Sequence, residues 1–574
     1  MFRHATQYEA DHPGALVTPS FPHGSVAELL LARAEDDHPA LLFGDQTLTW
    51  REFVAAARVR AGALTALRRP GPWHVGVLMD NDPEYLLLIA GAALCGATVV
   101  GVNPTRRGAE LAADIRATDC QTLVVGPRHR ALVDGVEAAE LAGVDVLDAD
   151  GERYRDVVAR AQAHPVATTA PPGAEHVLLL LFTSGSTGAP KAVVCSSFRL
   201  AVIGQLNRHG LTRDDVAYNA MPLFHGNALM AAWAPILVVG GTLAMRDRFS
   251  ASGFLPDVER FGATFFNYVG RALSYVLAQP EDPREGRTRL RYGFGTEAST
   301  RDREEFVRRF GCRVVESYGS SEGVCAILRS PDTPPGALGR PDPQMGLEIV
   351  GSSGAVCPPA AFGPDGRLLN AAEAIGEIVV RGGAARFEGY YNNPAAMAAK
   401  VRDGDFWTGD LAYADAEGHY WFAGRSSDWI RVDSENFATA PIERILARHP
   451  AVATAVVYGV PDPRTGDEVM ASLLLVPGES LDAAELDRFL DAQPDLGTKW
   501  RPRLVRLVDE LPLTGTGKLD KQVLRGEAWL TDDLLLHATP DGYRPFTAAD
   551  RTAREASFAA HGRLALHPTE RQHP

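Results

Sequence analysis

The sequence predicts an α/β protein with a large N-terminal domain of parallel-rich sheets, helices and a small β portion, followed by a smaller C-terminal α+β domain. Over the first 130 residues, short apolar strands alternate with helical segments, a pattern typical of parallel strands joined by helical crossovers. A continuous apolar stretch at residues 176–182 predicts another buried strand. The composition changes at residues 424–428, and a compact α/β stretch follows to about residue 530.

Local signals place the first helices. Ser25 can cap a helix over residues 26–34. The sequence Thr49-Trp-Arg-Glu52 is a capping box, because each end residue can bond the backbone of the other. It predicts a helix that ends near residue 67.

Later elements follow from shorter apolar runs. Residues 331–364 are rich in Pro and Gly, which predicts loops and shorter antiparallel strands. The last forty-odd residues are predicted to form a tail on the surface. Strands are expected at residues 74–79, 98–102, 122–125, 453–460 and 471–476, with a hairpin at residues 41–48.

The length, composition and charge exclude several classes of protein. At roughly 150 residues per domain, 574 residues allow three or four folding units. A content of 45% hydrophobic and 22% charged residues is typical of a globular protein, and it excludes a disordered chain, collagen or a coiled coil. The net charge of −15 argues against a nucleic-acid partner and against attachment to anionic lipid through a basic face.

The cysteines and the N-terminus favour a cytoplasmic protein. The 6 cysteines form no CxxC pair, so we expect reduced core residues and neither a disulfide framework nor a zinc site. The first residues show no apolar segment of a signal peptide. Residues 85–102 lack charge and approach the length of a membrane span, but Gly91, Gly96 and Gly101 interrupt them. They predict a buried helix ending at Gly96 and then a short buried strand, with no membrane span.

The strongest chemical signal is the loop that follows the apolar strand. Its sequence is Phe182-Thr-Ser-Gly-Ser-Thr-Gly-Ala-Pro-Lys191. Glycines let a backbone approach a ligand closely, and amides, hydroxyls and the lysine can all donate to phosphate oxygens. The spacing before the lysine and the residue after it exclude a Walker A motif. A flexible Gly/Ser turn is the alternative, and phosphate binding is the interpretation we favour.

The loop resembles the phosphate-binding motif of the adenylate-forming superfamily, which includes acyl-CoA synthetases, peptide-synthetase adenylation domains and luciferases. Other segments resemble the family's remaining motifs in the family's order. The resemblance covers residues 182–518. The segments are Pro222-Leu-Phe-His-Gly226, Tyr318-Gly-Ser-Ser-Glu322, Trp407-Thr-Gly-Asp-Leu411, Gly424-Arg425 through Glu443, and Leu511-Pro-Leu-Thr-Gly-Thr-Gly-Lys518.

The resemblance implies a division into three parts. Residues 1–425 would form the N-terminal adenylate-forming domain, with the ATP and acyl pockets. Residues 426–530 would form a mobile C-terminal lid that carries the catalytic lysine, and residues 531–574 a tail. The lid would swing about Ser426 and Ser427 between two half-reactions, a known kind of domain switch.

The resemblance also implies roles in the reaction of MgATP with a carboxylate. Glu322 would hold Mg²⁺, a hard cation that prefers carboxylate oxygen. Asp410, supported by Arg425, would accept from the ribose hydroxyls, although the two could instead form a structural salt bridge. Lys518 would lie between the acyl carboxylate and the α-phosphate, its alternative being an exposed surface lysine. The pyrophosphate portion would be held by Thr183, Ser184, Gly185, Ser186, Thr187, Gly188 and Lys191.

Other matching positions are assigned in the same way. His225 would help gate the acyl pocket, unless it is a structural histidine, and Tyr318 could stack on adenine or simply pack. Residues 293–298 lie where the family has its adenine-facing turn, without the common small-residue-Ala-Pro sequence. The implied ATP and AMP contacts are Gly295, Thr296, Glu297, Tyr318, Gly319, Ser320 and Ser321, and the implied coenzyme A channel is Ser434, Glu435 and Asn436.

Within the superfamily the chain is similar to fatty-acid-transport-protein-like, very-long-chain acyl-CoA synthetases. The similar segments are residues 222–229, 434–439 and 542–547. This similarity implies that a bulky hydrophobic acid (very-long-chain, sterol-like or a polycyclic natural product) is joined through acyl-AMP to coenzyme A. The reaction would use ATP and Mg²⁺. The sequence leaves open whether the protein forms a homodimer.

Several positions depart from the family's pattern. Ser321 replaces a threonine, Ser427 lies at the hinge where Asp or Lys is usual, and Ser434 replaces a glycine. Arg431 replaces a lysine, and Ala192 follows Lys191 in place of glycine. These changes leave an alternative open, in which the enzyme receives acyl-AMP from a partner adenylating enzyme or passes it to a carrier protein. A non-catalytic binding protein on a synthetase scaffold is a second alternative.

Overall fold

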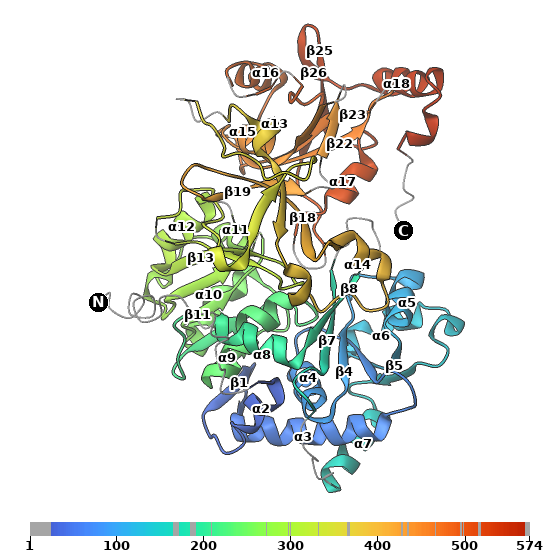
Figure 1. Cartoon of the computed structure of the whole chain (residues 1–574), viewed down its shortest axis with the longest axis vertical. Coiled ribbons are helices and arrows are strands. Elements are labelled where there is room, and N and C mark those ends of the chain that lie inside the picture. Colours follow the sequence, from blue (N-terminus) through green and yellow to red (C-terminus); the bar gives the residue numbers. More distant parts are fainter. Residues whose placement is uncertain are drawn as a thin grey trace.

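The computed structural model describes residues 24–164, 172–183, 191–207, 209–270, 272–296, 298, 300–330, 332–363, 368–425, 429–432, 435–464, 466–493, 496–497, 499–514 and 518–568. Figure 1 shows the N-terminal part, in blue and green, below, and the C-terminal part, in orange and red, above it. Two large sheets with helices make up the N-terminal part, and a smaller antiparallel sheet leads to the C-terminal one. This arrangement confirms the predicted fold class.

The first large sheet has the strand order β6-β5-β3-β4-β7-β8. All neighbours from β6 to β7 are parallel, and β8 closes one edge as an antiparallel hairpin partner of β7. The strands are β3 (His74–Leu78), β4 (Thr98–Gly101), β5 (Cys120–Val125), β6 (Asp145–Asp148), β7 (Val177–Thr183) and β8 (Lys191–Ser196). The helices are α3 (Trp50–Leu67), α4 (Pro83–Cys95), α5 (Gly108–Ala117), α6 (Arg130–Asp134) and α7 (Glu152–Ala163).

The second large sheet has the order β14-β13-β12-β11-β9-β10-β1-β2. Its central strands are parallel, with antiparallel β14 and β2 at the edges. The strands are β1 (Pro39–Phe43), β2 (Gln46–Thr49), β9 (Val216–Asn219), β10 (Thr242–Met245), β11 (Phe265–Asn267), β12 (Tyr292–Gly295), β13 (Arg313–Gly319) and β14 (Ala326–Leu328). The helices are α2 (Val26–Leu31), α8 (Ser197–Leu206), α9 (Ala234–Val239), α10 (Ala251–Phe261), α11 (Ala272–Leu277) and α12 (Thr300–Phe310), with a π-helix at Ala228–Trp233.

Local signals account for several helix ends, although α2 ends at Leu31, before the predicted residue 34. Ser25 accepts from the Glu28 amide at the start of α2, and both bonds of the predicted capping box form at the start of α3. The uncharged stretch forms α4 and then β4, and α4 ends at Gly96 in the left-handed conformation, with φ of 89°. This confirms a buried helix and strand. No described helix combines the length and apolar character that crossing a membrane requires.

The small antiparallel sheet follows the second large sheet in the chain. Its β18 pairs with β16, β17 and β19, and β15 extends it beyond β16. The elements are β15 (Leu347–Val350), β16 (Gly376–Val380), α14 (Pro394–Lys400), β17 (Val401–Arg402), β18 (Asp405–Ala414) and β19 (Tyr420–Arg425).

The C-terminal part has a two-stranded hairpin and a five-stranded sheet of order β22-β23-β24-β25-β26. The hairpin is β20 (Trp429–Val432) and β21 (Glu435–Ala438). The remaining elements are α15 (Ala440–Leu446), β22 (Val452–Pro461), β23 (Asp467–Leu475), α16 (Ala483–Asp491), β24 (Leu504–Val508), α17 (Lys521–Glu527), β25 (Leu534–Thr539), β26 (Gly542–Pro545) and α18 (Ala548–Ala560).

The chain after residue 530 differs from the expected surface tail. Strand β25 pairs with β24, and β26 pairs with β25, so these residues complete the C-terminal sheet. The Arg554 guanidinium of α18 lies 3.9 Å from the ring centroid of Trp529 and pairs with Glu468, and Phe558 is fully buried. A boundary at residue 530 therefore cuts through a sheet. Short strands joined by a tight turn carry little periodic signal, which explains the difference.

Candidate active site

The predicted phosphate loop connects two paired strands. Thr183 ends β7, Lys191 begins β8, and the two residues are direct cross-strand partners. Lys191 is buried, and its ammonium lies 5.5 Å from the ring centroid of Tyr390. Ser184, Gly185, Ser186, Thr187 and Gly188 lie outside the described residues.

Tyr390 also contacts the carboxylate of the Tyr318–Glu322 segment. Its hydroxyl donates to Glu322 Oε1 at 2.6 Å. Burial raises the pKa of Glu322, but the hydrogen bonds from Tyr390, from its own backbone amide and from Ser320, together with the charge of Lys400, lower the pKa by more, so it falls below its usual value. Glu322 is therefore an anion at neutral pH, and the same tyrosine lies against a cation, Lys191.

A second bridge joins the Tyr318–Glu322 segment to the Trp407–Leu411 segment. The Tyr318 hydroxyl donates to Asp410 Oδ2 at 2.7 Å, and its ring packs against the core of the small sheet. Burial and the charge of Asp410 raise the pKa of Tyr318 well above its usual value, so it remains a neutral donor. In β18, Asp410 is the cross-strand partner of Arg425 in β19. Two motifs separated by 92 positions therefore meet directly.

Lys400 was not singled out from the sequence. It ends α14, and its ammonium donates to the carbonyl oxygen of Thr408, two residues before Asp410. Burial lowers its pKa, and the charges of Glu322, Asp410 and Glu377 act in the opposite direction. Glu377 in turn accepts from the Gly409 amide at 2.6 Å. The sequence offered one signal for this cation, a lysine at the end of a short helix before the Trp407–Leu411 motif.

The histidine segment lies beside the Tyr318–Glu322 segment. A side chain at Gly226 would begin 3.5 Å from Ser321 Oγ and 3.4 Å from Met230 Sδ, so little space separates them. His225 is partly buried, and its Nδ1 accepts from the Asn227 amide at 3.4 Å. The π-helix begins directly afterwards, and such irregular turns often occur at functional sites.

The predicted adenine-facing turn follows β12. Gly295 is the last residue of that strand, and a Cβ atom there would lie 2.5 Å from the carbonyl oxygen of Tyr268. The carbonyl of Thr296 accepts from the Gly270 amide at 2.9 Å. Gly319 ends β13, and Ser320 accepts from the Gly323 amide at 2.9 Å. Glu297 lies outside the described residues.

Lys518 lies in the C-terminal part, just before α17. Its amide donates to Thr514 Oγ1 at 3.1 Å, and its carbonyl accepts from the Thr514 amide at 2.7 Å, so both ends of this loop are held together. Glu435 and Asn436 belong to β21. Ser426, Ser427 and Ser434 lie outside the described residues.

The donor set fits Mg²⁺ that arrives with a nucleotide. Among the described residues, no group of three or more His, Cys, Asp or Glu side chains is arranged to hold a metal ion. Mg²⁺ is usually bound through one or two carboxylates together with substrate phosphates, and it keeps several waters. A single anionic carboxylate, Glu322, which contacts the same tyrosine as the lysine of the predicted phosphate loop, meets that requirement.

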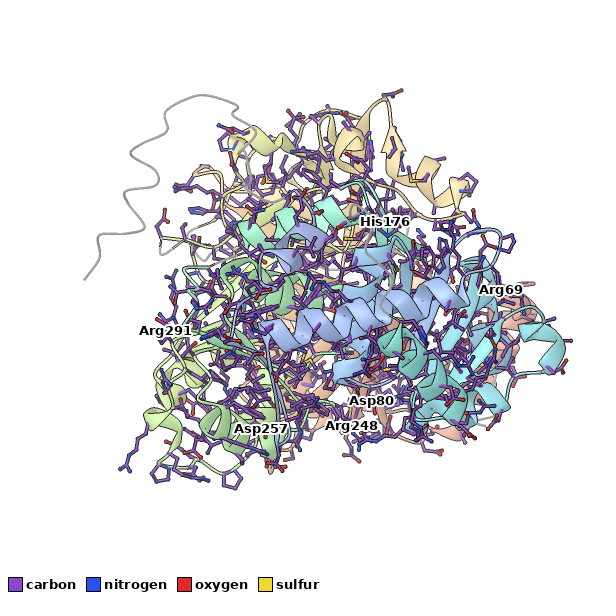
Figure 2. All side chains as sticks on the ribbon, turned by 90° about the horizontal axis from the view of Figure 1, so that it is seen from below. Arg69, Asp80, His176, Arg248, Asp257 and Arg291 are labelled. Carbon is purple, nitrogen blue, oxygen red and sulfur yellow. The ribbon has the colours of Figure 1, made fainter. Side chains whose placement is uncertain are left out.

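A cavity of about 690 Å³ lies elsewhere in the N-terminal part. It opens beyond the carboxyl ends of β3, β5 and β10, and none of its lining residues belongs to a motif. Asp80 and Asp257 line its wall, and Figure 2 shows them on the same side of α3, the long helix across this face. Arg128 spans the cavity wall, pairing with Asp80 at 3.0 Å and Asp247 at 2.8 Å.

Comparison with known proteins gives matches along most of the chain. The AMP-binding enzyme family matches residues 31–391, and the C-terminal domain of AMP-binding enzymes matches residues 441–518. The chain is 48% identical to the steroid-22-oyl-CoA synthetase of Rhodococcus jostii, over 94% of this chain and 98% of that relative. It is 43% identical to the medium/long-chain-fatty-acid–CoA ligase FadD17 of Mycobacterium tuberculosis, over 89% of this chain and 97% of that relative.

A solved structure shows the same fold. The ATP-bound MatB of Rhodopseudomonas palustris superposes with a TM-score of 0.74 at 26% identity, over 87% of this chain and 98% of that one. The family match covers more than half of the chain, and the two relatives match it almost from end to end. The chain therefore belongs to the AMP-binding enzyme family, among the ATP-dependent, AMP-forming acyl-CoA synthetases of the adenylate-forming superfamily.

Proposed function

We propose that this enzyme activates a bulky hydrophobic carboxylic acid, of the steroid side-chain or long-chain type, and transfers it to coenzyme A. The acid would first react with ATP to give acyl-AMP and pyrophosphate, and the thiol would then displace AMP. The observation that supports the proposal is Tyr390, whose hydroxyl donates to the anion Glu322 and whose ring centroid lies 5.5 Å from the ammonium of Lys191. The names of the two relatives support the class of acid.

The charges suit the first half-reaction. Lys191 and the preceding loop would hold the β- and γ-phosphates, and Glu322 would hold the Mg²⁺ that neutralises them. Asp410, oriented by Tyr318, would accept from the ribose hydroxyls, with Arg425 beside it. Lys518 would stabilise the charge that develops between the acyl carboxylate and the α-phosphate.

The histidine segment suits a hydrophobic acid. His225 is followed by the apolar π-helix, in which Leu229 and Trp233 are buried and Met230 is partly buried, and we assign the wall of the acyl pocket to this segment. An apolar lining with few polar groups is typical of small-molecule sites. His225, at the edge of this wall, would separate the acyl pocket from the nucleotide.

The second half-reaction would require the C-terminal part to move. We assign the swing to Ser426 and Ser427, after an N-terminal domain of residues 1–425, and the thiol channel to the segment with Ser434, Glu435 and Asn436. One face of the lid would present Lys518 for adenylation and another would admit coenzyme A. The 6 free cysteines are consistent with a reducing compartment, and we place the reaction in the cytoplasm.

Acyl-CoA, measured by mass spectrometry in two parallel reactions, tests the proposal. One reaction contains a steroid side-chain acid or a long-chain fatty acid with MgATP and coenzyme A. The other contains the synthetic acyl-adenylate and coenzyme A without ATP. We expect product in both, with benzoate as a poor substrate. Product from the adenylate alone would contradict the full ligase and direct attention to a partner adenylating enzyme, an alternative that the comparisons do not support.

The Lys518→Ala variant separates the two half-reactions. It should lose adenylation by about 100-fold or more, the scale for removing a group that stabilises developing charge. Thioester formation from supplied acyl-AMP should be spared. Equal loss of both would contradict the assignment of two faces to the lid.

A further inference from the structure

A buried arginine outside every motif contacts the turn that contains Glu322. Arg199 lies in the first turn of α8, directly after β8, and is 7% exposed. A charge buried this deeply is costly unless its hydrogen bonds are made. The groups that contact the guanidinium must therefore account for its burial.

The guanidinium makes two hydrogen bonds to backbone oxygens. Nη1 donates to the Val194 carbonyl at 2.7 Å, and Nη2 donates to the Ser321 carbonyl, the residue before Glu322. Nη1 also lies 3.8 Å from Glu388 Oε2. Its Nε is buried and makes no hydrogen bond. A buried donor without an acceptor is unfavourable, so stability alone does not explain an arginine here.

The same guanidinium lies under the residue after Glu322. Gly323 has a left-handed φ of 61°, and a Cβ atom there would lie 2.5 Å from Arg199 Nη2. The side chain thus holds the backbone on both sides of Glu322, at residue 321 by a hydrogen bond and at residue 323 by close contact.

Glu388 joins this contact to the segment that carries Tyr390. Its carboxylate accepts from the Ser196 amide at 2.7 Å and from the Ser196 hydroxyl. The Val194 amide of β8 donates to the Gly389 carbonyl at 3.0 Å. Arg199 therefore links the three segments that carry Lys191, Glu322 and Tyr390.

We propose that Arg199 is a positioning residue for adenylation: by fixing the turn around Glu322 against β8, it sets the relation of that carboxylate to Lys191 and so the affinity for Mg²⁺-bound triphosphate. The inference rests on the proposed function, in which Glu322 holds the Mg²⁺ of MgATP. Removing the guanidinium should leave Glu322 present but displaced, and thereby weaken metal-dependent binding. Steps that do not use the metal should be spared.

The test compares Arg199→Met, Arg199→Lys and Glu322→Gln in the full chain. Titration calorimetry measures ATP binding with Mg²⁺ and with EDTA, and kinetics measure KM for MgATP apart from kcat. We expect Arg199→Met to weaken MgATP binding roughly tenfold, the scale for a residue that orients a metal ligand. Arg199→Lys should recover part of this loss. AMP binding and thioester formation from supplied acyl-AMP should change less than about twofold, because neither needs the metal.

Arg309→Lys is the matched control. Arg309 is also 7% exposed, but it pairs with Glu285, and neither residue belongs to a motif. It should leave the Mg²⁺ dependence unchanged. If Arg199→Met does not fold, Glu388→Gln, which removes the arginine's carboxylate neighbour, should give a smaller loss of the same kind.

The outcomes separate the inference from the proposed function. Arg199 variants that bind MgATP as the native enzyme does would overturn the inference, as would equal losses of MgATP binding and of thioester formation from acyl-AMP. A Glu322→Gln variant that keeps its Mg²⁺ dependence would instead overturn the metal assignment on which the inference rests.

Discussion

Two clusters of charged residues differ in the groups that contact their cations. At the 690 Å³ cavity, Arg128 pairs with two aspartates, Arg246 pairs with Asp257 and Arg260 pairs with Asp45. At the candidate active site, Lys191 lies against an aromatic ring and Lys400 donates to a backbone carbonyl. Within the part of the chain that the structure describes, neither ammonium forms an ion pair.

This difference is the basis of the separate roles that we propose for the two clusters. Cations that are paired with carboxylates neutralise each other and have little attraction left for an anionic ligand. Cations that are held by neutral groups keep their charge available for one. We therefore propose that phosphate binds at the cluster that contains Lys191, whose ammonium lies against a neutral ring, although the other cluster surrounds a cavity.

The largest effect is expected at Lys191. Lys191→Ala removes a cation that would face the phosphates of ATP, and we expect pyrophosphate release to fall about 100-fold, as when a group that stabilises transition-state charge is lost. A steady-state assay of pyrophosphate, with the acid saturating, measures it.

Arg128→Ala is the matched control for Lys191→Ala. Its cation is already paired, so the rate should change by less than about twofold, because exposed ion pairs contribute little. Similar losses in both variants would break the comparison between the two clusters.

A smaller effect is expected at Tyr390. Tyr390→Phe removes the hydroxyl that donates to Glu322, a hydrogen bond to a charged group, and such bonds contribute about 1.5–3 kcal/mol. The pKa of Glu322 should rise, and the Mg²⁺ concentration needed for half-maximal adenylation should increase roughly tenfold. Tyr391→Phe, whose hydroxyl contacts Asp119 instead, is the control. An unchanged Mg²⁺ requirement in Tyr390→Phe would contradict this bridge.

The pH dependence at Lys400 sharpens the comparison. Burial lowers its pKa, so the ammonium loses its proton at a lower pH than an ordinary lysine does. MgATP affinity should therefore fall as the pH rises through this lowered pKa. Arg stays protonated, so Lys400→Arg should lack this alkaline decline. The test is to measure MgATP affinity between neutral and alkaline pH for the native protein and for Lys400→Arg. Identical pH profiles would rule out a role of the Lys400 charge in MgATP binding.

The smallest effect is expected for stability at the cavity. Arg128→Met should lower the free energy of unfolding by about 0–1 kcal/mol, because water screens this exposed pair. Burial raises the pKa of Asp247, but the hydrogen bonds and charges of Arg128 and Arg248 lower it by more. The pKa of Asp247 in the folded protein is therefore below its usual value. The ion pair therefore stabilises the fold at pH values above the pKa of Asp247 in the unfolded chain. This stabilisation is lost as the pH falls through the pKa of Asp247 in the folded protein. In urea unfolding, the free energies of unfolding of the native protein and the variant should therefore become equal below about pH 4. A difference in free energy that grows as the pH falls would contradict this prediction.

The sequence alone predicts the motifs, but it does not predict several of the residues that contact them. The capping box at Thr49, the helix that ends at Gly96 and the order of the motifs follow from neighbouring residues. Tyr390, Lys400 and Arg199 lie in no recognised motif. The sequence also did not predict that the chain beyond residue 530 continues the C-terminal sheet. The strands β25 and β26 are recognised only from their pairing, β25 with β24 and β26 with β25.

The sequence by itself determined the fold class, the start of α3 and the end of α4, and it proposed the residues that could carry the chemistry, because these signals depend on side chains a few positions apart. Only the tertiary structure decided which of those residues meet. Tyr390 reaches Glu322 across 68 positions, Tyr318 reaches Asp410 across 92, and Arg199 reaches Ser321 across 122. The order and register of the strands set such contacts, and those result from packing the whole core, which no local pattern records.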